Sequence, residues 1–216
     1  MGIVHNFKKI ACQQKYKGWP LVGDYRFGEK IPFFGQELAY TLRTGNGDES
    51  YHSFIRHFGW VVVFGVNRCG NVLTIVQWKP GVNEASWEFP PGGIGKIASG
   101  ATDAEIMQKT QEIYLRETGY GNGKWEKLGQ ILIETGKYRG ASPNDHGLPA
   151  HLIIATDLEK IQDSRQLNRN EIMETLEVPL GEFREVIESG LFKEATAVPC
   201  ALLALVKLGY LQWKQE

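Results

Sequence analysis

The chain has 216 residues, with 24 lysines and arginines against 25 aspartates and glutamates, so its formal net charge is −1 at pH 7. This length fits one large domain with its own core, and the balanced charge argues against nucleic acid or an anionic membrane as a partner. No apolar run approaches the roughly 20 residues of a membrane-spanning helix, and the first residues lack the apolar stretch of a signal peptide. The three widely spaced cysteines predict free thiols, and we expect a cytoplasmic protein.

The N-terminal part of the chain differs in composition from the rest. Residues 1–36 are rich in aromatic residues, glycine and proline, and we expect an N-terminal extension of short strands or loops. The main domain should span residues 37–216. It begins with a loosely alternating segment, followed at residues 45–48 by Gly-Asn-Gly-Asp, which predicts a tight turn because Asn-Gly readily adopts positive φ. Residues 50–57 then predict the partner strand of a hairpin.

The remaining elements follow from β-branched and aromatic runs, which predict strands, and from apolar residues at helical spacing. Thr102 or Asp103 can cap the central helix, and Gly119 can end it. Strands on both sides of one central helix, followed by two further helices, predict an α/β fold, an α/β/α sandwich on a mixed sheet. We expect strands at residues 60–66, 72–78, 87–89, 125–134, 151–157 and 174–178, and helices at residues 103–118, 180–189 and 195–209.

Several short motifs occur in a fixed order along the chain. Residues 73–82 read Leu-Thr-Ile-Val-Gln-Trp-Lys-Pro-Gly-Val, residues 87–93 read Trp-Glu-Phe-Pro-Pro-Gly-Gly, residues 117–120 read Glu-Thr-Gly-Tyr, and residues 188–197 end in Glu-Ala-Thr-Ala. In this order they resemble the Nudix hydrolases, in the branch of the ADP-ribose pyrophosphatases, from about residue 37 to about residue 210. The resemblance implies a Nudix-type sandwich with a loop–helix–loop motif. In that family the helix carboxylates hold divalent metal against a diphosphate, for which hard oxygen ligands are suited.

The helix part of this family's motif reads R-E-U-x-E-E-x-G-U, where U is apolar, and Gly119 anchors it in this chain. With that anchor, Glu112 stands at the arginine position, Ile113 at the first glutamate and Arg116 at the second. Only Glu117 keeps the expected carboxylate. The stretch from the loop glycines to the end of the motif is also longer than the pattern, and its early glutamate has no clear counterpart.

Two interpretations of this departure stay open. In the first, glutamates that bind metal in the family have been replaced in this chain, and Arg116 places a cation where the metal's charge would lie. In the second, a one-residue bulge in the helix lets both Glu112 and Glu117 reach metal, with help from Glu105 or Glu88. Straight-helix geometry opposes the second interpretation, since residues five apart lie roughly 140° apart around the axis.

The resemblance also assigns candidate roles. Asp145 lies in a long polar loop, residues 136–149, where relatives place a catalytic carboxylate. The catalytic candidates are Glu117, Glu112 and Asp145. The metal-binding candidates are Glu117, Glu112, Glu88 and the backbone carbonyl of Pro91. The substrate-binding candidates are Trp78, Lys79, Arg116, Gly92 and Gly93.

Two functions compete on these residues. The first is an enzyme that hydrolyses a nucleoside diphosphate linked to another group, of the ADP-ribose or nucleotide-sugar class, with Mg²⁺ or Mn²⁺. The second is a binding or regulatory module on the same fold, in which Arg116 contacts phosphate directly. In both cases the partner is a nucleotide-type small molecule. The branch often dimerises through N-terminal strands, so the aromatic-rich segment Trp19–Tyr40 is a candidate homodimer element.

Overall fold

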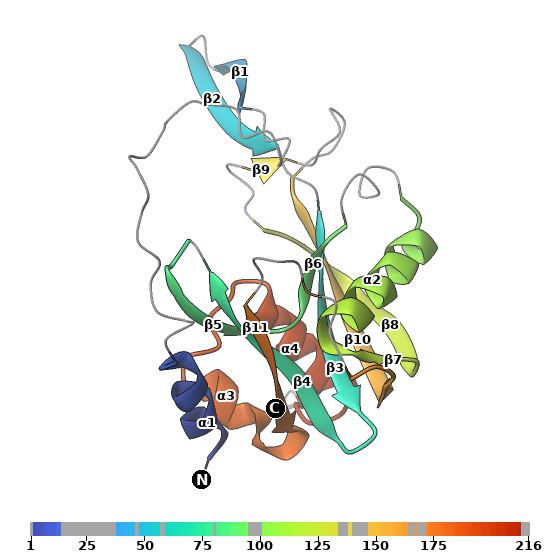
Figure 1. Ribbon diagram of the computed structural model, residues 1–216. Coiled ribbons are helices and arrows are strands. Elements are labelled where there is room, and N and C mark those ends of the chain that lie inside the picture. Colours follow the sequence, from blue (N-terminus) through green and yellow to red (C-terminus); the bar gives the residue numbers. More distant parts are fainter. Residues whose placement is uncertain are drawn as a thin grey trace.

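The computed structural model describes residues 2–13, 38–45, 48–56, 59–79, 81–94, 101–133, 138–139, 147–163, 167 and 172–212, and side chains at all of these except 38–56, 91 and 138–139. Every strand and helix expected from residue 60 onward overlaps an observed element (Figure 1). In chain order the elements are α1 (Ile3–Ala11), β1 (Leu38–Gly45), β2 (Asp48–Arg56), β3 (Trp60–Asn67), β4 (Asn71–Lys79), β5 (Glu84–Glu88), β6 (Pro91–Gly93), α2 (Asp103–Thr118), β7 (Tyr120–Gly121), β8 (Lys124–Leu132), β9 (Tyr138–Arg139), β10 (Pro149–Lys160), β11 (Met173–Pro179), the 3-10 helix η3 (Leu180–Glu182), α3 (Phe183–Glu188) and α4 (Ala197–Lys207).

The larger sheet has eight strands, and it is mixed. Its central path runs β11-β4-β3-β10-β7, with β5 on β4, β6 on β3 and β8 on β10. The β3–β10 pair is parallel, whereas the other pairs in this sheet are antiparallel. A second sheet contains β1, β2 and β9, and the antiparallel pairing of Gly45 with Asp48 confirms the predicted hairpin.

Strands β3 and β4 pair only at the end next to their connecting turn, at Gly65–Leu73 and Val66–Val72. Farther along, β4 pairs with β5, and β3 pairs with β6. The sheet therefore divides into one wing made of β11, β4 and β5 and another made of β6, β3, β10 and β8. The short segment from Glu88 to Gly92 crosses from one wing to the other, and it carries the proline- and glycine-rich motif.

Buried side chains form one cluster on each face of the sheet, because successive strand residues point to opposite faces. Val62 and Phe64 of β3 join the cluster covered by α1, α3 and α4, whereas Val61 and Val63 join the cluster beneath α2. Helices thus cover both faces, α2 on one and α3 and α4 on the other (Figure 1). This confirms the predicted α/β/α sandwich on a mixed sheet.

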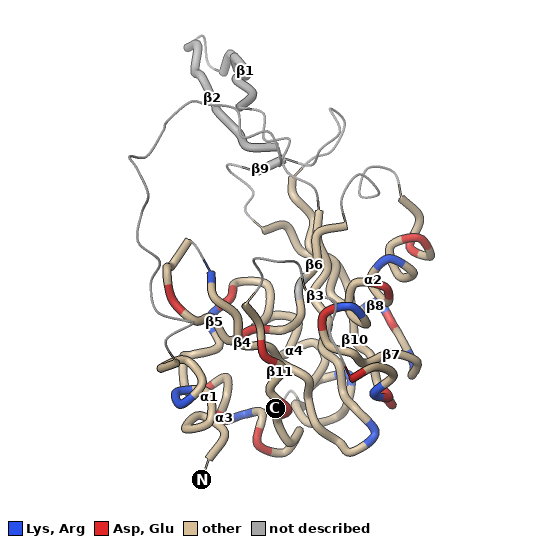
Figure 2. The backbone as a smooth tube through the Cα atoms, in the orientation of Figure 1, with Lys and Arg blue, Asp and Glu red and all other residues tan. Residues whose placement is uncertain are grey.

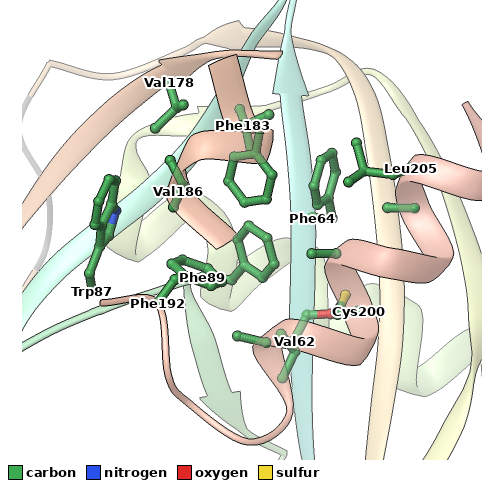
Figure 3. Packing of buried hydrophobic residues seen from close by; sticks show 14 of the residues in the cluster. Val62, Phe64, Trp87, Phe89, Val178, Phe183, Val186, Phe192, Cys200 and Leu205 are labelled. Carbon is green, nitrogen blue, oxygen red and sulfur yellow. Dashed lines mark hydrogen bonds between the residues drawn. The ribbon is translucent and has the colours of Figure 1, made fainter. Parts of the chain in front are cut away.

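Aromatic residues fill the centre of the larger cluster, where Figure 3 shows Phe64, Phe89, Phe183 and Phe192 side by side. The rings of Phe89 and Phe192 lie edge to face at 4.8 Å between centroids, and Phe89 stacks on Phe183 at 5.7 Å. Such pairs add to the burial of the rings themselves. This packing anchors Phe89, in the middle of the segment that joins the two wings.

The central helix α2 begins and ends where the sequence predicts. Its N-terminus has a capping box, in which Thr102 Oγ1 accepts from the backbone N–H of Glu105 and the Glu105 carboxylate accepts from the backbone N–H of Thr102. Its C-terminus ends at Gly119, which has φ of 80°. A glycine suits this left-handed position because it has no Cβ to clash.

The expectation of short strands or loops near the N-terminus is wrong for residues 3–11, which form helix α1. Ile3 and Phe7 lie on its buried face, and Phe7 stacks on Trp87 with ring centroids 4.8 Å apart. The apolar periodicity of this segment is short, so the helix is stabilised more by this tertiary packing than by the helix propensity of its residues. Of the predicted dimer segment, residues 19–37 lie outside the described residues, and the pairing of two copies stays a prediction.

No helix in the described part of the chain has the length and apolar character needed to cross a membrane.

Candidate functional site

The C-terminal half of α2 packs against β6 through Ile113. This side chain is 6% exposed and lies over Gly92, where an added Cβ would meet Ile113 Cγ2 at 2.6 Å. A glycine is therefore required at this contact, because any side chain there would displace the isoleucine. The position that holds the first glutamate in the resembled motif thus carries an apolar side chain pressed against the backbone of the loop.

Glu117 lies one helical turn after Ile113 and is 5% exposed. Arg116 donates a hydrogen bond to Glu117 Oε1 at 2.8 Å, and the side chain of Arg116 is 41% exposed. A cation therefore adjoins the carboxylate of the helix end. The buried Nε of Arg116 has no hydrogen-bond partner among the described residues.

Glu112 lies apart from Glu117, because α2 is an uninterrupted α-helix from Asp103 to Thr118 and contains no bulge that would turn Glu112 inward. The Glu112 side chain is 53% exposed and pairs with Lys109 at 2.9 Å. This hydrogen bond and charge hold the pKa of Glu112 below its ordinary value. The described helix therefore supports the straight geometry and leaves Glu112 on the solvated face.

Glu88 is the most buried carboxylate of the candidate set, at 1% exposed. Its Oε2 lies 3.2 Å from Lys79 Nζ. Burial raises the pKa of Glu88, while the Lys79 charge and the nearby Gln77 amide partly counter that rise. A buried charge needs such a partner, so the structure places Glu88 as the counter-ion of Lys79, and brings together a metal candidate and a substrate candidate.

The other predicted residues are less closely grouped. Gly93 is exposed, with nothing within 4 Å of an added Cβ, and Pro91 pairs with Val62 in the sheet. Trp78 packs against the larger core cluster, on the face opposite Lys79 and Glu88. Trp87 is fully buried and donates to Thr74 Oγ1 at 2.9 Å, so it is part of the core. Asp145 lies outside the described residues.

The described carboxylates do not fit a divalent metal site of the family's kind. No group of three or more His, Cys, Asp or Glu side chains among the described residues could hold a metal ion. Glu117 adjoins a guanidinium, Glu88 adjoins an ammonium, and Glu105 is occupied in the helix cap. The cations beside Glu117 and Glu88 oppose the binding of a divalent cation there. Asp145 lies outside the described residues, so the Mg²⁺ or Mn²⁺ expectation stays a prediction.

Acidic and basic residues are interspersed along the described chain, and α2 carries both signs (Figure 2). Most ion pairs are between exposed side chains, such as Lys193 with Glu84 and Arg184 with Glu188. Exposed pairs of this kind contribute little to stability. The Lys79–Glu88 and Arg116–Glu117 pairs differ because one partner of each is buried. Glu88 begins the segment between the wings, and Glu117 lies one helical turn after Ile113, which contacts Gly92 at the end of that segment.

Two polar residues of this region, Gln77 and Thr175, were not singled out as site residues from sequence. Gln77 precedes Lys79 on β4, and Thr175 lies on β11, almost 100 residues away along the chain. Cross-strand register places both on the sheet face that Glu88 occupies. Strand alternation could have suggested Gln77, but no local signal links it with Thr175.

Two comparisons show what the chain is similar to. The structure matches a crystal structure described as an ADP compounds hydrolase, with a TM-score of 0.65 and 18% sequence identity, over 85% of this chain and 92% of that chain. The sequence is 26% identical to ADP-ribose pyrophosphatase of Bacillus subtilis (strain 168) over 144 residues, which cover 67% of this chain and 70% of that protein. No protein-family model matches the chain. The chain is a mixed α/β protein with distant homology to an ADP-ribose pyrophosphatase.

Proposed function

We propose that this chain binds a nucleoside diphosphate joined to a second group, in the class of ADP-ribose and the nucleotide sugars. We further propose that a side-chain cation, rather than a metal held by carboxylates, neutralises the diphosphate. The observation that carries this proposal is the replacement at the end of α2, where Ile113 covers Gly92 and Arg116 adjoins Glu117. The ligand class comes from the similarity to an ADP-ribose pyrophosphatase.

Arg116 has the chemistry that this role requires. A guanidinium is always charged at neutral pH, and its planar donors match the oxygens of a phosphate. One nitrogen of Arg116 is committed to Glu117, and the side chain remains 41% exposed. Arg116 can therefore hold a phosphate while Glu117 fixes its orientation.

Hydrolysis of the same ligand class is the second candidate, favoured by the 26% identity to an ADP-ribose pyrophosphatase. It would use Glu117 with Glu112 or Asp145 and a bound Mg²⁺ or Mn²⁺. The described residues do not supply that ligand set, because Glu112 faces solvent and Glu117 is paired with Arg116. This is why we place binding before catalysis.

A calorimetric titration separates the two candidates. A non-hydrolysable ADP-ribose analogue is titrated into the pure protein with EDTA, and then with Mg²⁺ or Mn²⁺. Binding of equal affinity in all three conditions, without turnover of ADP-ribose itself, is the result we expect. Affinity that rises with metal, together with turnover that Glu117→Gln abolishes, would replace the binding proposal with the hydrolase.

The role of Arg116 has its own test. Arg116→Gln should weaken binding of the analogue by about tenfold or more, since hydrogen bonds to charged groups contribute about 1.5–3 kcal/mol. Arg116→Lys should restore only part of that affinity, because an ammonium lacks the planar fork. Lys109→Gln is the matched control, since Lys109 lies on the same helix and pairs with exposed Glu112. Equal losses in both glutamine variants would mean that Arg116 does not contact phosphate.

Restoring the missing carboxylates gives a converse test. The variant Ile113→Glu with Arg116→Glu recreates both acidic positions of the resembled motif beside Glu117. It should bind Mg²⁺ where the wild type does not, whereas the uncharged control Ile113→Gln with Arg116→Gln should not. Equal Mg²⁺ affinity of the wild type and the acidic variant would show that the residues at positions 113 and 116 do not determine whether the protein binds Mg²⁺.

A further inference from the structure

His151 lies beneath the N-terminal half of α2, in the interior of the sandwich. On β10 it stands two residues before Ile153, which belongs to the cluster under α2, so its side chain points to the same side of the sheet. Its neighbours in the same row are Val61 on β3 and Gln130 on β8. His151 is 5% exposed, and its Nδ1 has no hydrogen-bond partner among the described residues. The interior under α2 therefore holds a titratable ring with one nitrogen unused.

An ion pair in the same place joins β8 to the first residue of α2. Lys127 Nζ lies 2.5 Å from Asp103 Oδ1, and the Lys127 side chain is 29% exposed. Lys127 pairs in register with Ile153, and Asp103 begins α2. Both charges act on the imidazole of His151, because Lys127 repels its protonated form and Asp103 attracts it. These three residues are named the His151 cluster below.

The charges around His151 come from two elements. Among the described residues, Lys127 from β8 and Asp103 from α2 are the charged groups that act on the imidazole. Glu105, the other acid in the first turn of α2, is occupied in the helix cap, and β3 presents apolar Val61 on this side. The response of His151 to pH therefore depends on one cation and one anion. Titratable residues of the adjoining sequence that lie outside the described residues are Lys96, Asp145 and His146.

The docked helix opposes protonation of His151. Burial and the Lys127 charge lower the pKa of His151, and the Asp103 charge counters only part of this effect. While α2 is docked, the ring therefore stays neutral at pH values where a solvated histidine, with a pKa of about 6.5, takes up a proton. If the N-terminal half of α2 lifts off the sheet, the ring reaches water and can be protonated. The open form binds the proton more tightly than the docked form, so lower pH favours opening.

We propose that protonation of His151 releases the N-terminal half of α2 from the sheet, and that the His151 cluster is a pH-sensitive contact within the fold. The C-terminal half of α2 is held separately, by Ile113 over Gly92, so the opening can be local. One proton changes this equilibrium by at most about a factor of ten per pH unit, and only below about pH 6.5. The population of the open form should therefore rise by up to about tenfold between about pH 7.5 and about pH 5.5.

Hydrogen exchange of the α2 amides tests the proposal. Protection factors, which correct for the intrinsic pH dependence of exchange, are measured for the amides of residues 106–110. Over the same pH range they should fall by up to about tenfold in the wild type and stay constant in His151→Gln. The matched control is His5→Gln, at an exposed histidine on α1, which should keep the wild-type dependence. Amides of β3 report global unfolding, and the α2 amides should be less protected than these at each pH.

Two variants at the ion pair separate a pH-sensitive contact from a merely structural one. Lys127→Met and Asp103→Asn both remove the bond between β8 and α2. Lys127→Met also removes the charge that repels the protonated ring, so the pH dependence of protection should shrink. Asp103→Asn removes the charge that attracts the protonated ring, so the pH dependence should persist and extend to lower pH.

Three results would overturn the proposal. The first is protection of the wild-type α2 amides that does not change with pH. The second is protection of these amides equal to that of β3 at every pH, because His151 would then act only through global unfolding. The third is the same change of pH dependence in Lys127→Met and Asp103→Asn, because the ion pair would then have only a structural role. This last comparison does not use His151→Gln, so it stands even if that core variant fails to fold.

Discussion

The contact between Gly92 and Ile113 gives a stability prediction that can be worked from geometry. In Gly92→Ala the new Cβ would lie 2.6 Å from Ile113 Cγ2 and 3.1 Å from Cδ1, so α2 or β6 must shift. Overpacking of this kind costs about 1–3 kcal/mol, whereas replacing glycine restricts the unfolded chain and returns about 0.4–1 kcal/mol. The mid-range values of these two effects differ by about 1.3 kcal/mol, so the variant should lose roughly that much unfolding free energy, within outer bounds of about 0 and 2.6 kcal/mol.

Gly93→Ala is the matched control, because nothing lies within 4 Å of its added Cβ on the same strand. It should be neutral or slightly stabilising. Urea unfolding of both variants is then repeated with Ile113→Ala, which removes the two atoms that the new Cβ would meet. The cost of Gly92→Ala should shrink in that background. Equal costs in both backgrounds, or equal effects at both glycines, would refute the packing of α2 on β6 described above.

Three further predictions concern the frame around the site. Phe7→Ala should destabilise the protein by about 3–5 kcal/mol in urea unfolding, because Phe7 is buried in its stack on Trp87, and no change would mean that α1 is not docked. Thr102→Ala should cost about 0.5–2 kcal/mol through loss of the helix cap, whereas Thr102→Ser should recover most of it. Burial and Lys127 lower the pKa of His151, so the folded state resists its protonation and stability should fall as pH decreases below about 6.5. His151→Gln should flatten this pH dependence of the unfolding free energy, and an unchanged slope would remove His151 as its source.

The sequence alone was a good guide to local structure. The capping box and Gly119 place both ends of α2, since caps depend on residues within one turn of the helix. The β-branched runs placed β3, β4 and β10, and the turn at residues 45–48 placed the first hairpin. The sequence did not predict helix α1, because its amphipathic pattern is short. The helix is stabilised mainly by packing of its apolar face against Trp87 and the core.

The candidate site divides in the same way. From sequence alone, with Gly119 as the anchor, Ile113 and Arg116 are predicted to depart from the resembled motif. Whether Glu112 could take the place of a missing carboxylate depends on the continuity of the helix and on the exposure of the side chain. Only the structure gives these two properties: α2 is uninterrupted, and Glu112 pairs with Lys109 at the surface.

The pairing of strands that lie far apart in the chain was decided only by the tertiary structure. Residue types and their local spacing determine helices, turns and the alternation of a strand, because those depend on neighbours within a few residues. Cross-strand register depends on how the whole core packs, since a one-residue slip would move every side chain to the other face. That register alone brings Thr175 of β11 into the row of Glu88 on β5, on the sheet face beneath α2.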